Sequence, residues 1–245
     1  MPELPEVDRA RDALERRVVG RRIEAVGDQD TFVCRPFAPG HIAAALVGHQ
    51  IVGVRRTGKQ LLVDTTGPVL GIHFGMSGSL RFDVPTDARF TRFWLRFDDG
   101  GTLVLRDPRR LGRVGLDPAR RLGQDALLVD GPAFRDLVGR SRAPVKARLL
   151  DQAVVAGIGN LLADEALWRA RIDPRRRGVD LDRAELIRLY RAVRASVRDA
   201  IAAGGSGRTR FGTVRKVGIC PRDGVPLSSA KVGGRTTRWC PREQR

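Results

Sequence analysis

The chain has 245 residues, 42% of them hydrophobic, so it can bury the core of one large domain or of two modest ones. Its formal net charge of +17 favours a polyanionic partner, of which nucleic acid is the commonest. The sequence has no apolar run long enough to span a membrane, and its acidic, proline-rich start is unlike a secretory signal, so we expect a cytoplasmic protein.

The first element that the sequence predicts is a helix over residues 5–19. Apolar residues recur at helical spacing from Val7 to Val18, and Gly20 follows as a stop. Pro5 suits the first turn, where its missing N–H costs nothing. Glu6 then lies in the first turn, where the helix dipole favours an anion.

Residues 21–115 have the pattern of strands. Short β-type runs occur at 51–54 and 61–63, and apolar residues alternate over 93–97. The turn signal Asp98–Gly101 predicts a hairpin. We therefore expect an antiparallel sandwich or barrel-like sheet in this half of the chain.

The pattern becomes helical after residue 125. Two helices, over 145–155 and 161–171, are expected to flank a glycine-containing turn at 156–160. A long helix is expected to start at a capping box formed by Asp182 and Glu185. The last forty residues carry many Gly, Arg and Thr, and no clear helix is expected there.

The predicted fold is therefore α+β in three parts. Residues 1–125 are expected to form a β-sandwich domain with an N-terminal helix. Residues 126–205 are expected to form a helical domain, and residues 206–245 a β-hairpin.

The most specific chemistry lies at the N-terminus. Removal of Met1 would expose the secondary amine of Pro2, which can attack a sugar C1′ and form a charged iminium ion. Glu3 could protonate the sugar ring or the departing base, and Glu6 could orient the amine. The alternative is a plain helix lead-in with two solvated acids.

Together with four further motifs, this N-terminus resembles the formamidopyrimidine-DNA glycosylase and endonuclease VIII family. The matching segments, in order, are Met1–Val7, Arg55–Leu62, His73–Leu80, Asp107–Gly112 and Leu150–Leu167. The last segment is similar to the family's helix–two-turns–helix element. The resemblance implies a monomeric glycosylase and AP lyase that removes oxidised bases from double-stranded DNA and cuts the abasic strand by β,δ-elimination.

The resemblance also implies roles for individual side chains. Lys59 matches a lysine that contacts phosphate near the damaged nucleotide and completes a catalytic set with Pro2, Glu3 and Glu6. Seven further residues match DNA-contacting positions: His73, Met76, Arg109, Leu111, Lys146, Asn160 and Arg235.

Among these seven, Met76, Arg109 and Leu111 match side chains that fill the gap left by an extruded base. The family often has an aromatic ring at the position of Leu111. Plain structural alternatives remain open: a surface role for Lys59 or Lys146, and core packing for Met76. Two more are a structural role for His73 and a helix N-cap at Asn160, where neighbouring backbone N–H groups could also bind phosphate.

The C-terminus departs from the family's zinc hairpin, which has two C-x-x-C pairs. Cys220 and Cys240 remain, but Asp223 and Glu243 stand where their partners would be. Structural zinc normally takes four Cys or His ligands, so we expect a hairpin without zinc and no cofactor. Packing by four apolar residues should support it instead: Ile219, Val225, Leu227 and Trp239.

A second departure is the short stretch from Gly205 to Cys220, which leaves little room for the lid that covers an extruded purine in 8-oxoguanine-type members. The lesion preference therefore stays open. Two rival functions are a non-catalytic binder of damaged DNA on the same fold and a ribosome-associated basic protein. Retention of Pro2, Glu3, Glu6 and Lys59 favours the enzyme.

Overall fold

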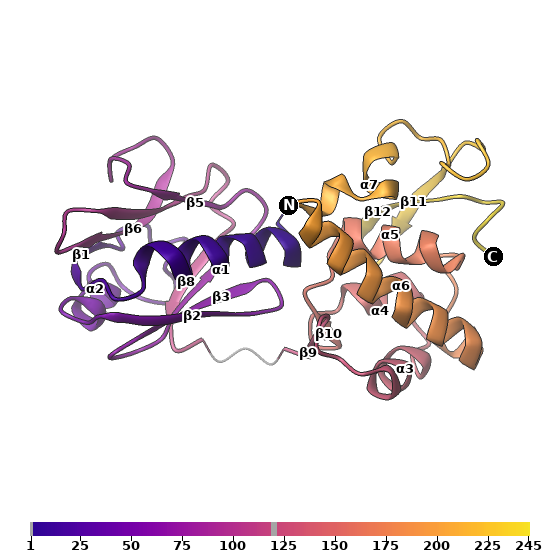
Figure 1. Ribbon diagram of the computed structural model, residues 1–245, viewed down its shortest axis with the longest axis horizontal. Helices are drawn as coiled ribbons and strands as arrows, with labels where there is room; N and C mark the ends of the chain where they lie inside the picture. The colour runs from indigo at the N-terminus through magenta and orange to yellow at the C-terminus, as the bar shows by residue number, and fades with distance from the viewer. Residues whose placement is uncertain (1, 119–121) are drawn as a thin grey trace. The chain divides into compact units, whose positions relative to one another are not determined.

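The computed structural model describes residues 2–118 and 122–245, which divide into two compact units. Among these residues, the first unit contains Pro2 and residues 7–118. The second unit contains Glu3–Glu6 and residues 122–245. The first helical turn thus belongs to the second unit, an assignment that the sequence pattern does not reveal. Figure 1 shows the course of the chain and its helices and strands.

The first unit is built on two antiparallel four-stranded sheets, ordered β1-β6-β7-β5 and β2-β3-β4-β8. Its elements are α1 (Leu4–Val18), β1 (Ile23–Gly27), α2 (His41–Leu46), β2 (Ile51–Thr57), β3 (Gln60–Thr65), β4 (Leu70–His73), β5 (Ser79–Phe82), β6 (Thr91–Phe97), β7 (Thr102–Arg106) and β8 (Arg113–Leu116). The antiparallel sandwich expected from the sequence is confirmed.

Alternation along the strands produces this core. In β3 and β4, Leu61, Val63 and Ile72 are buried on one face, whereas Gln60 and His73 lie on the other. The apolar stripe of α1 covers the same core with Leu14 and its neighbours.

The second unit is mainly helical. Its elements are β9 (Gln124–Asp125), α3 (Gly131–Gly139), α4 (Val145–Leu150), β10 (Val155–Ala156), α5 (Asn160–Ala170), η1 (Gly178–Asp180), α6 (Arg183–Ala202), η2 (Ser206–Arg208), α7 (Arg210–Val214), β11 (Ser228–Val232) and β12 (Arg235–Trp239). One continuous core joins α3, α4, α5 and α6, and Leu4 contributes to it.

Three local predictions can be compared with this structure. The capping box of Asp182 and Glu185 is present at the start of α6. The helix expected over 145–155 ends at Leu150, because Asp151 is extended and the chain then pairs as β10 with β9. The expectation of no helix in the last forty residues is wrong: α7 forms there, capped by the Thr209 side chain.

Candidate catalytic N-terminus and nucleic-acid interface

The Glu3 carboxylate caps the N-terminus of α5. Glu3 is fully buried, and its two oxygens accept hydrogen bonds from the backbone N–H groups of Leu161 (2.8 Å) and Leu162 (3.0 Å). A Cβ at Gly159 would lie 2.2 Å from Glu3 Cδ, so glycine there allows the approach. A carboxylate is favoured at a helix N-terminus. This contact therefore fixes Glu3, the residue that follows Pro2.

This contact corrects one expectation from the sequence. The first-turn N–H groups of α5 were candidates for binding a DNA phosphate, but those of Leu161 and Leu162 already bind Glu3. The N-cap of α5 is Gly159 and not Asn160. The anion at this helix terminus therefore comes from the protein itself.

Glu6 lies one turn further along α1 and holds the N-terminal segment from two sides. Its Oε2 accepts the backbone N–H of Glu3 at 2.9 Å. Its Oε1 accepts the backbone N–H (2.6 Å) and the hydroxyl (2.9 Å) of Ser206. Glu6 thus fixes the backbone next to Pro2 against η2, a positioning role within the second unit.

Lys59 occupies the two-residue turn between β2 and β3, where Thr57 pairs with Gln60. Gly58 provides the positive φ of 58° that this turn requires. A turn presents the lysine at the end of the hairpin, and the side chain is half-buried there.

His73 ends β4, and its Nδ1 accepts the backbone N–H of Gly75 at 3.1 Å. Met76 follows in a turn, with 37% of its surface exposed. An exposed methionine is unusual for core packing, so its position suits an apolar wedge.

The loop that carries Arg109 and Leu111 lies against the turn of Met76. A Cβ at Gly75 would lie 2.2 Å from the Leu111 carbonyl oxygen. Fully buried Asp107 accepts hydrogen bonds from the Ser77 hydroxyl and from the backbone N–H groups of Arg109 (3.2 Å) and Gly112 (2.7 Å). The two turns are thereby fixed to each other, with Arg109 exposed and Leu111 37% exposed.

Lys146, for which the resemblance implied a contact with DNA, has its described contacts inside the second unit. Its side chain is fully buried on α4, with Nζ 2.6 Å from the Asp164 carboxylate and 2.7 Å from the Thr237 hydroxyl. Burial lowers the pKa of Lys146, although the neighbouring Asp164 opposes this shift. The lysine therefore joins α4 to α5 and β12 inside the second unit.

Asp164 is the centre of this buried network. Arg215 donates to its second oxygen at 2.7 Å, and the Arg215 guanidinium also donates to the Thr236 carbonyl at 2.6 Å. Asn160, one turn earlier on α5, donates to the same carbonyl at 3.0 Å. Strand β12 is thus held against α5 by side chains of Asn160, Asp164 and Arg215.

The hairpin tip, Gly233–Arg235, is positioned by this arrangement. A Cβ at Gly233 would lie 2.9 Å from Ala147 Cα, so the tip packs closely on α4. Arg235 itself is exposed at the start of β12. Asn160 and Arg235 therefore lie on elements that are bound together, which suits a shared contact with a DNA backbone.

The zinc hairpin is incomplete in the described part of the chain. Cys220, Asp223 and Cys240 bring their donor atoms within 4.8 Å of one another. Glu243 does not join them, because its carboxylate lies 3.4 Å from Arg171 Nε and 3.7 Å from the Arg222 guanidinium. Two thiols and one carboxylate fall short of the four ligands of a structural zinc site.

Apolar side chains pack around Cys220 and Cys240 at the base of the hairpin, although one of the four expected residues does not take part. Cys220 and Cys240 are buried with Trp168 and Phe211, and Val225 and Leu227 pack against them. Trp239 is also buried, but Ile219 is 47% exposed, so its expected packing role is wrong.

The segment after α6 folds onto α5. The Glu165 carboxylate accepts backbone N–H groups of Phe211 (2.8 Å) and Gly212 (3.3 Å), and the Phe211 ring stacks on Trp168 at 5.5 Å. Residues 206–214 therefore form a short packed helix pair within the second unit.

Sequence reasoning gave no role to Asp107, Asp164 or Ser206, whose side chains position the predicted site residues. Asp107 follows a strand and precedes a proline, a usual place for a turn-forming aspartate. Nothing local distinguishes Asp164 or Ser206, because their partners lie 18 to 200 residues away.

These features define a protein with an N-terminal β-sandwich unit, a helix–two-turns–helix unit and a C-terminal hairpin. Residues 1–114 match the formamidopyrimidine-DNA glycosylase N-terminal domain, and residues 122–211 match the formamidopyrimidine-DNA glycosylase H2TH domain. The chain belongs to the formamidopyrimidine-DNA glycosylase family.

Full-length relatives agree with this assignment. The chain is 41% identical to the formamidopyrimidine-DNA glycosylase of Roseiflexus sp. (strain RS-1) and 38% identical to that of Halorhodospira halophila, covering 100% of both proteins in each case. The Lactococcus lactis Fpg in complex with abasic-site DNA has a TM-score of 0.89 and 28% identity, with both chains fully covered. No described helix meets the length and hydropathy needed to cross a membrane.

Proposed function

We propose that this protein is a DNA glycosylase of base excision repair with AP lyase activity, and that Pro2 is its nucleophile. The observation that carries the assignment of Pro2 is the fixation of the residues after it. Glu3 is fully buried at the N-terminus of α5, and Glu6 binds both the Glu3 backbone and Ser206. Such a fixed position is what a nucleophile needs in order to attack a sugar carbon.

The proposed chemistry begins once Met1 is removed. The Pro2 nitrogen forms a bond to the sugar C1′ as the bond from C1′ to the damaged base breaks, and the base leaves with a proton. The Pro2 nitrogen then gives up its proton, and the bond from C1′ to the ring oxygen breaks as that oxygen takes up a proton, which opens the sugar and leaves an iminium ion. The iminium ion withdraws electrons, so that loss of a proton from C2′ expels the 3′ phosphate. A second elimination, with loss of a proton from C4′, expels the 5′ phosphate and leaves a one-nucleotide gap, and water then hydrolyses the iminium bond and frees the sugar fragment.

We assign the acid–base work to Glu3 and the orientation of the amine to Glu6. Glu3 directly follows Pro2, so its carboxyl group lies one residue from the reacting amine. Lys59, in the β2–β3 turn, is assigned to a phosphate near the lesion. A carboxyl group that exchanges a proton in the transition state contributes about 10²–10⁴-fold to the rate.

The proposed substrate is double-stranded DNA with an oxidised base or an abasic site. One solved relative, the wild-type Lactococcus lactis Fpg, is a complex with oxidised-pyrimidine-containing DNA, with a TM-score of 0.90 and 28% identity. Met76 and Leu111 are assigned to the space left by the extruded base, and Arg109 to its partner base. His73, Asn160 and Arg235 are assigned to phosphates. The cytoplasmic location expected from the sequence suits this substrate.

We further propose that the hairpin folds without zinc. Glu243 would have to leave Arg171 and Arg222 to become a fourth ligand. The Arg222 guanidinium also lies 3.9 Å from the centre of the Trp168 ring and donates to the Trp168 carbonyl at 2.7 Å. These contacts hold the Cys220 turn against α5 by packing and charge.

The functional proposal is tested on duplexes that each carry one defined lesion: an oxidised purine, an oxidised pyrimidine or an abasic site. The wild-type protein should cut at least the abasic duplex and one oxidised-base duplex, and Pro2→Gly should cut both much more slowly. Binding of all three duplexes without any cutting would instead support the non-catalytic binder on the same fold.

A further inference from the structure

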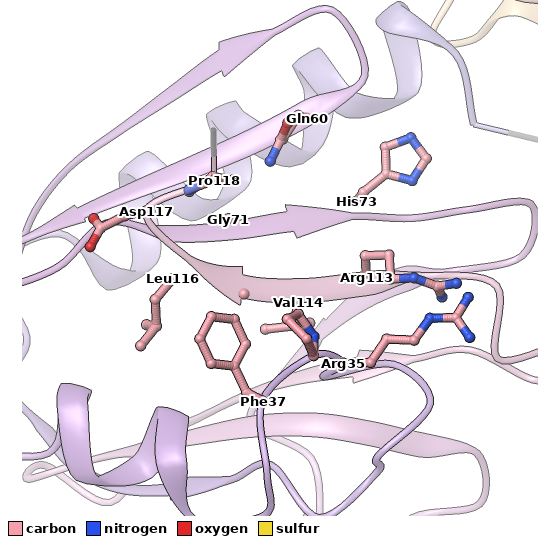
Figure 2. A pocket seen from close by; sticks show the side chains of 12 residues that line it. Arg35, Phe37, Gln60, Gly71, His73, Arg113, Val114, Leu116, Asp117 and Pro118 are labelled. Carbon is pink, nitrogen blue, oxygen red and sulfur yellow. The ribbon is translucent and has the colours of Figure 1, made fainter. Parts of the chain in front are cut away.

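A pocket of about 360 Å³ opens on the first unit, on the face of sheet β2-β3-β4-β8 that points away from the core (Figure 2). In-register residues of three adjacent strands, Gln60, His73 and Arg113, form one row of it. Its volume lies within the range of small-molecule sites, about 300–1,000 Å³. Apart from His73, no lining residue has a part in the proposed repair chemistry.

Two glycines that face each other across strands β4 and β8 let neighbouring side chains lie close to the sheet in this pocket. Gly71 pairs with Gly115 in register. A Cβ at Gly115 would lie 3.1 Å from the Phe37 ring, and one at Gly71 would lie 2.5 Å from Pro118 Cγ. An aromatic ring and a proline therefore lie directly on the sheet backbone, which suits a flat ring between them.

Gln60 supplies a buried polar group in this apolar setting. Its side chain is 8% exposed, and its amide nitrogen lies 3.0 Å from the position of a Cβ on Gly71. Its side-chain amide makes no hydrogen bond within the described part of the chain. Because the residue borders the pocket, its amide can offer both a donor and an acceptor to a ligand.

The two ends of the pocket differ in charge. Arg35, His73 and Arg113 lie at one end, and Asp117 lies at the other (Figure 2). The guanidinium groups of Arg35 and Arg113 both lie over the exposed Phe32 ring, at 4.2 and 5.4 Å from its centre. The cationic end suits a phosphate, and the protein's net charge of +17 adds to its attraction.

We propose that this pocket binds a nucleotide. Its phosphate lies at Arg35, His73 and Arg113, its base lies against Phe37 and Pro118, and Gln60 hydrogen-bonds the base edge. The ligand is either a free nucleoside monophosphate or an unpaired nucleotide of a DNA strand. This proposal shares His73 with the DNA contacts assigned above, but it uses none of the catalytic residues Pro2, Glu3, Glu6 and Lys59.

The test measures binding of three probes to the full-length protein by calorimetry: dGMP, a five-nucleotide single strand and inorganic phosphate. Saturation-transfer NMR on the base protons then reports whether the base itself touches the protein. Gln60→Met removes the amide at nearly constant length, and Arg35→Ala removes a cation. Gln29→Met, outside this pocket in the same unit, is the matched control, and thermal unfolding verifies that each variant folds.

The proposal expects Gln60→Met and Arg35→Ala each to weaken dGMP binding about tenfold, the loss of roughly one hydrogen bond, while Gln29→Met binds as the wild type does. Binding of the single strand that falls in parallel identifies a DNA strand as a second source of the nucleotide. Binding of the strand alone, with the same losses, identifies it as the only source. Inorganic phosphate that competes as well as dGMP, together with unchanged binding by Gln60→Met, would overturn the proposal, as would the absence of binding by every probe.

Discussion

Replacing Lys146 by Met tests whether this residue supports the fold or contacts DNA. The substitution keeps the length of the side chain but removes the charge that pairs with buried Asp164. Removing one partner of a buried ion pair costs about 3–5 kcal/mol. Since Arg215 still binds Asp164 at 2.7 Å, we expect the free energy of unfolding to fall by an amount at the lower end of this range, about 3 kcal/mol.

The assay is urea unfolding followed by tryptophan fluorescence. Trp94 lies in the first unit, whereas Trp168 and Trp239 lie in the second, so a Trp94→Phe background reports the second unit alone. Lys231→Met is the matched control, because Lys231 is exposed on β11, and it should change stability by no more than about 0.5 kcal/mol. If both lysine variants unfold alike but only Lys146→Met binds DNA weakly, this account of Lys146 is wrong.

Three further predictions concern the chemistry, the partner base and the metal. Glu3→Gln should slow base removal about 10²–10⁴-fold and slow cutting of a preformed abasic site far less, as measured on matched duplexes; equal, small losses would argue for a positioning role. Arg109→Ala should lower cutting of duplex DNA and blur any preference for the opposite base, and an equal loss on single strands would show that Arg109 does not read that base. Elemental analysis should find far less than one zinc per chain, chelators should leave activity unchanged, and Arg235→Ala should still weaken DNA binding; stoichiometric zinc lost together with activity would contradict this.

The sequence predicted much of the fold because its signals are local. Alternating apolar residues mark the strands, and the box of Asp182 and Glu185 marks the start of α6. Motifs such as Asp107–Gly112 carry their turn chemistry within a few residues. Such features depend only on neighbours along the chain.

Contacts between distant segments were not predictable in the same way. Glu3 binds N–H groups at 161 and 162, and Lys146 reaches Thr237 across 91 residues. The local sequence of a motif does not show whether its lysine is solvated or paired with a buried aspartate. The sequence alone also cannot show that the Glu243 carboxylate lies beside arginine side chains while the Asp223 carboxylate lies beside cysteine thiols.

The central claim is that the Pro2 amine attacks the sugar. Borohydride reduction of the protein on an abasic duplex should trap a covalent adduct, and peptide mapping should place it at an N-terminal peptide that begins with Pro2 and lacks Met1. Pro2→Gly should trap much less. An adduct that maps to Lys59, or that forms undiminished in Pro2→Gly, would contradict the account.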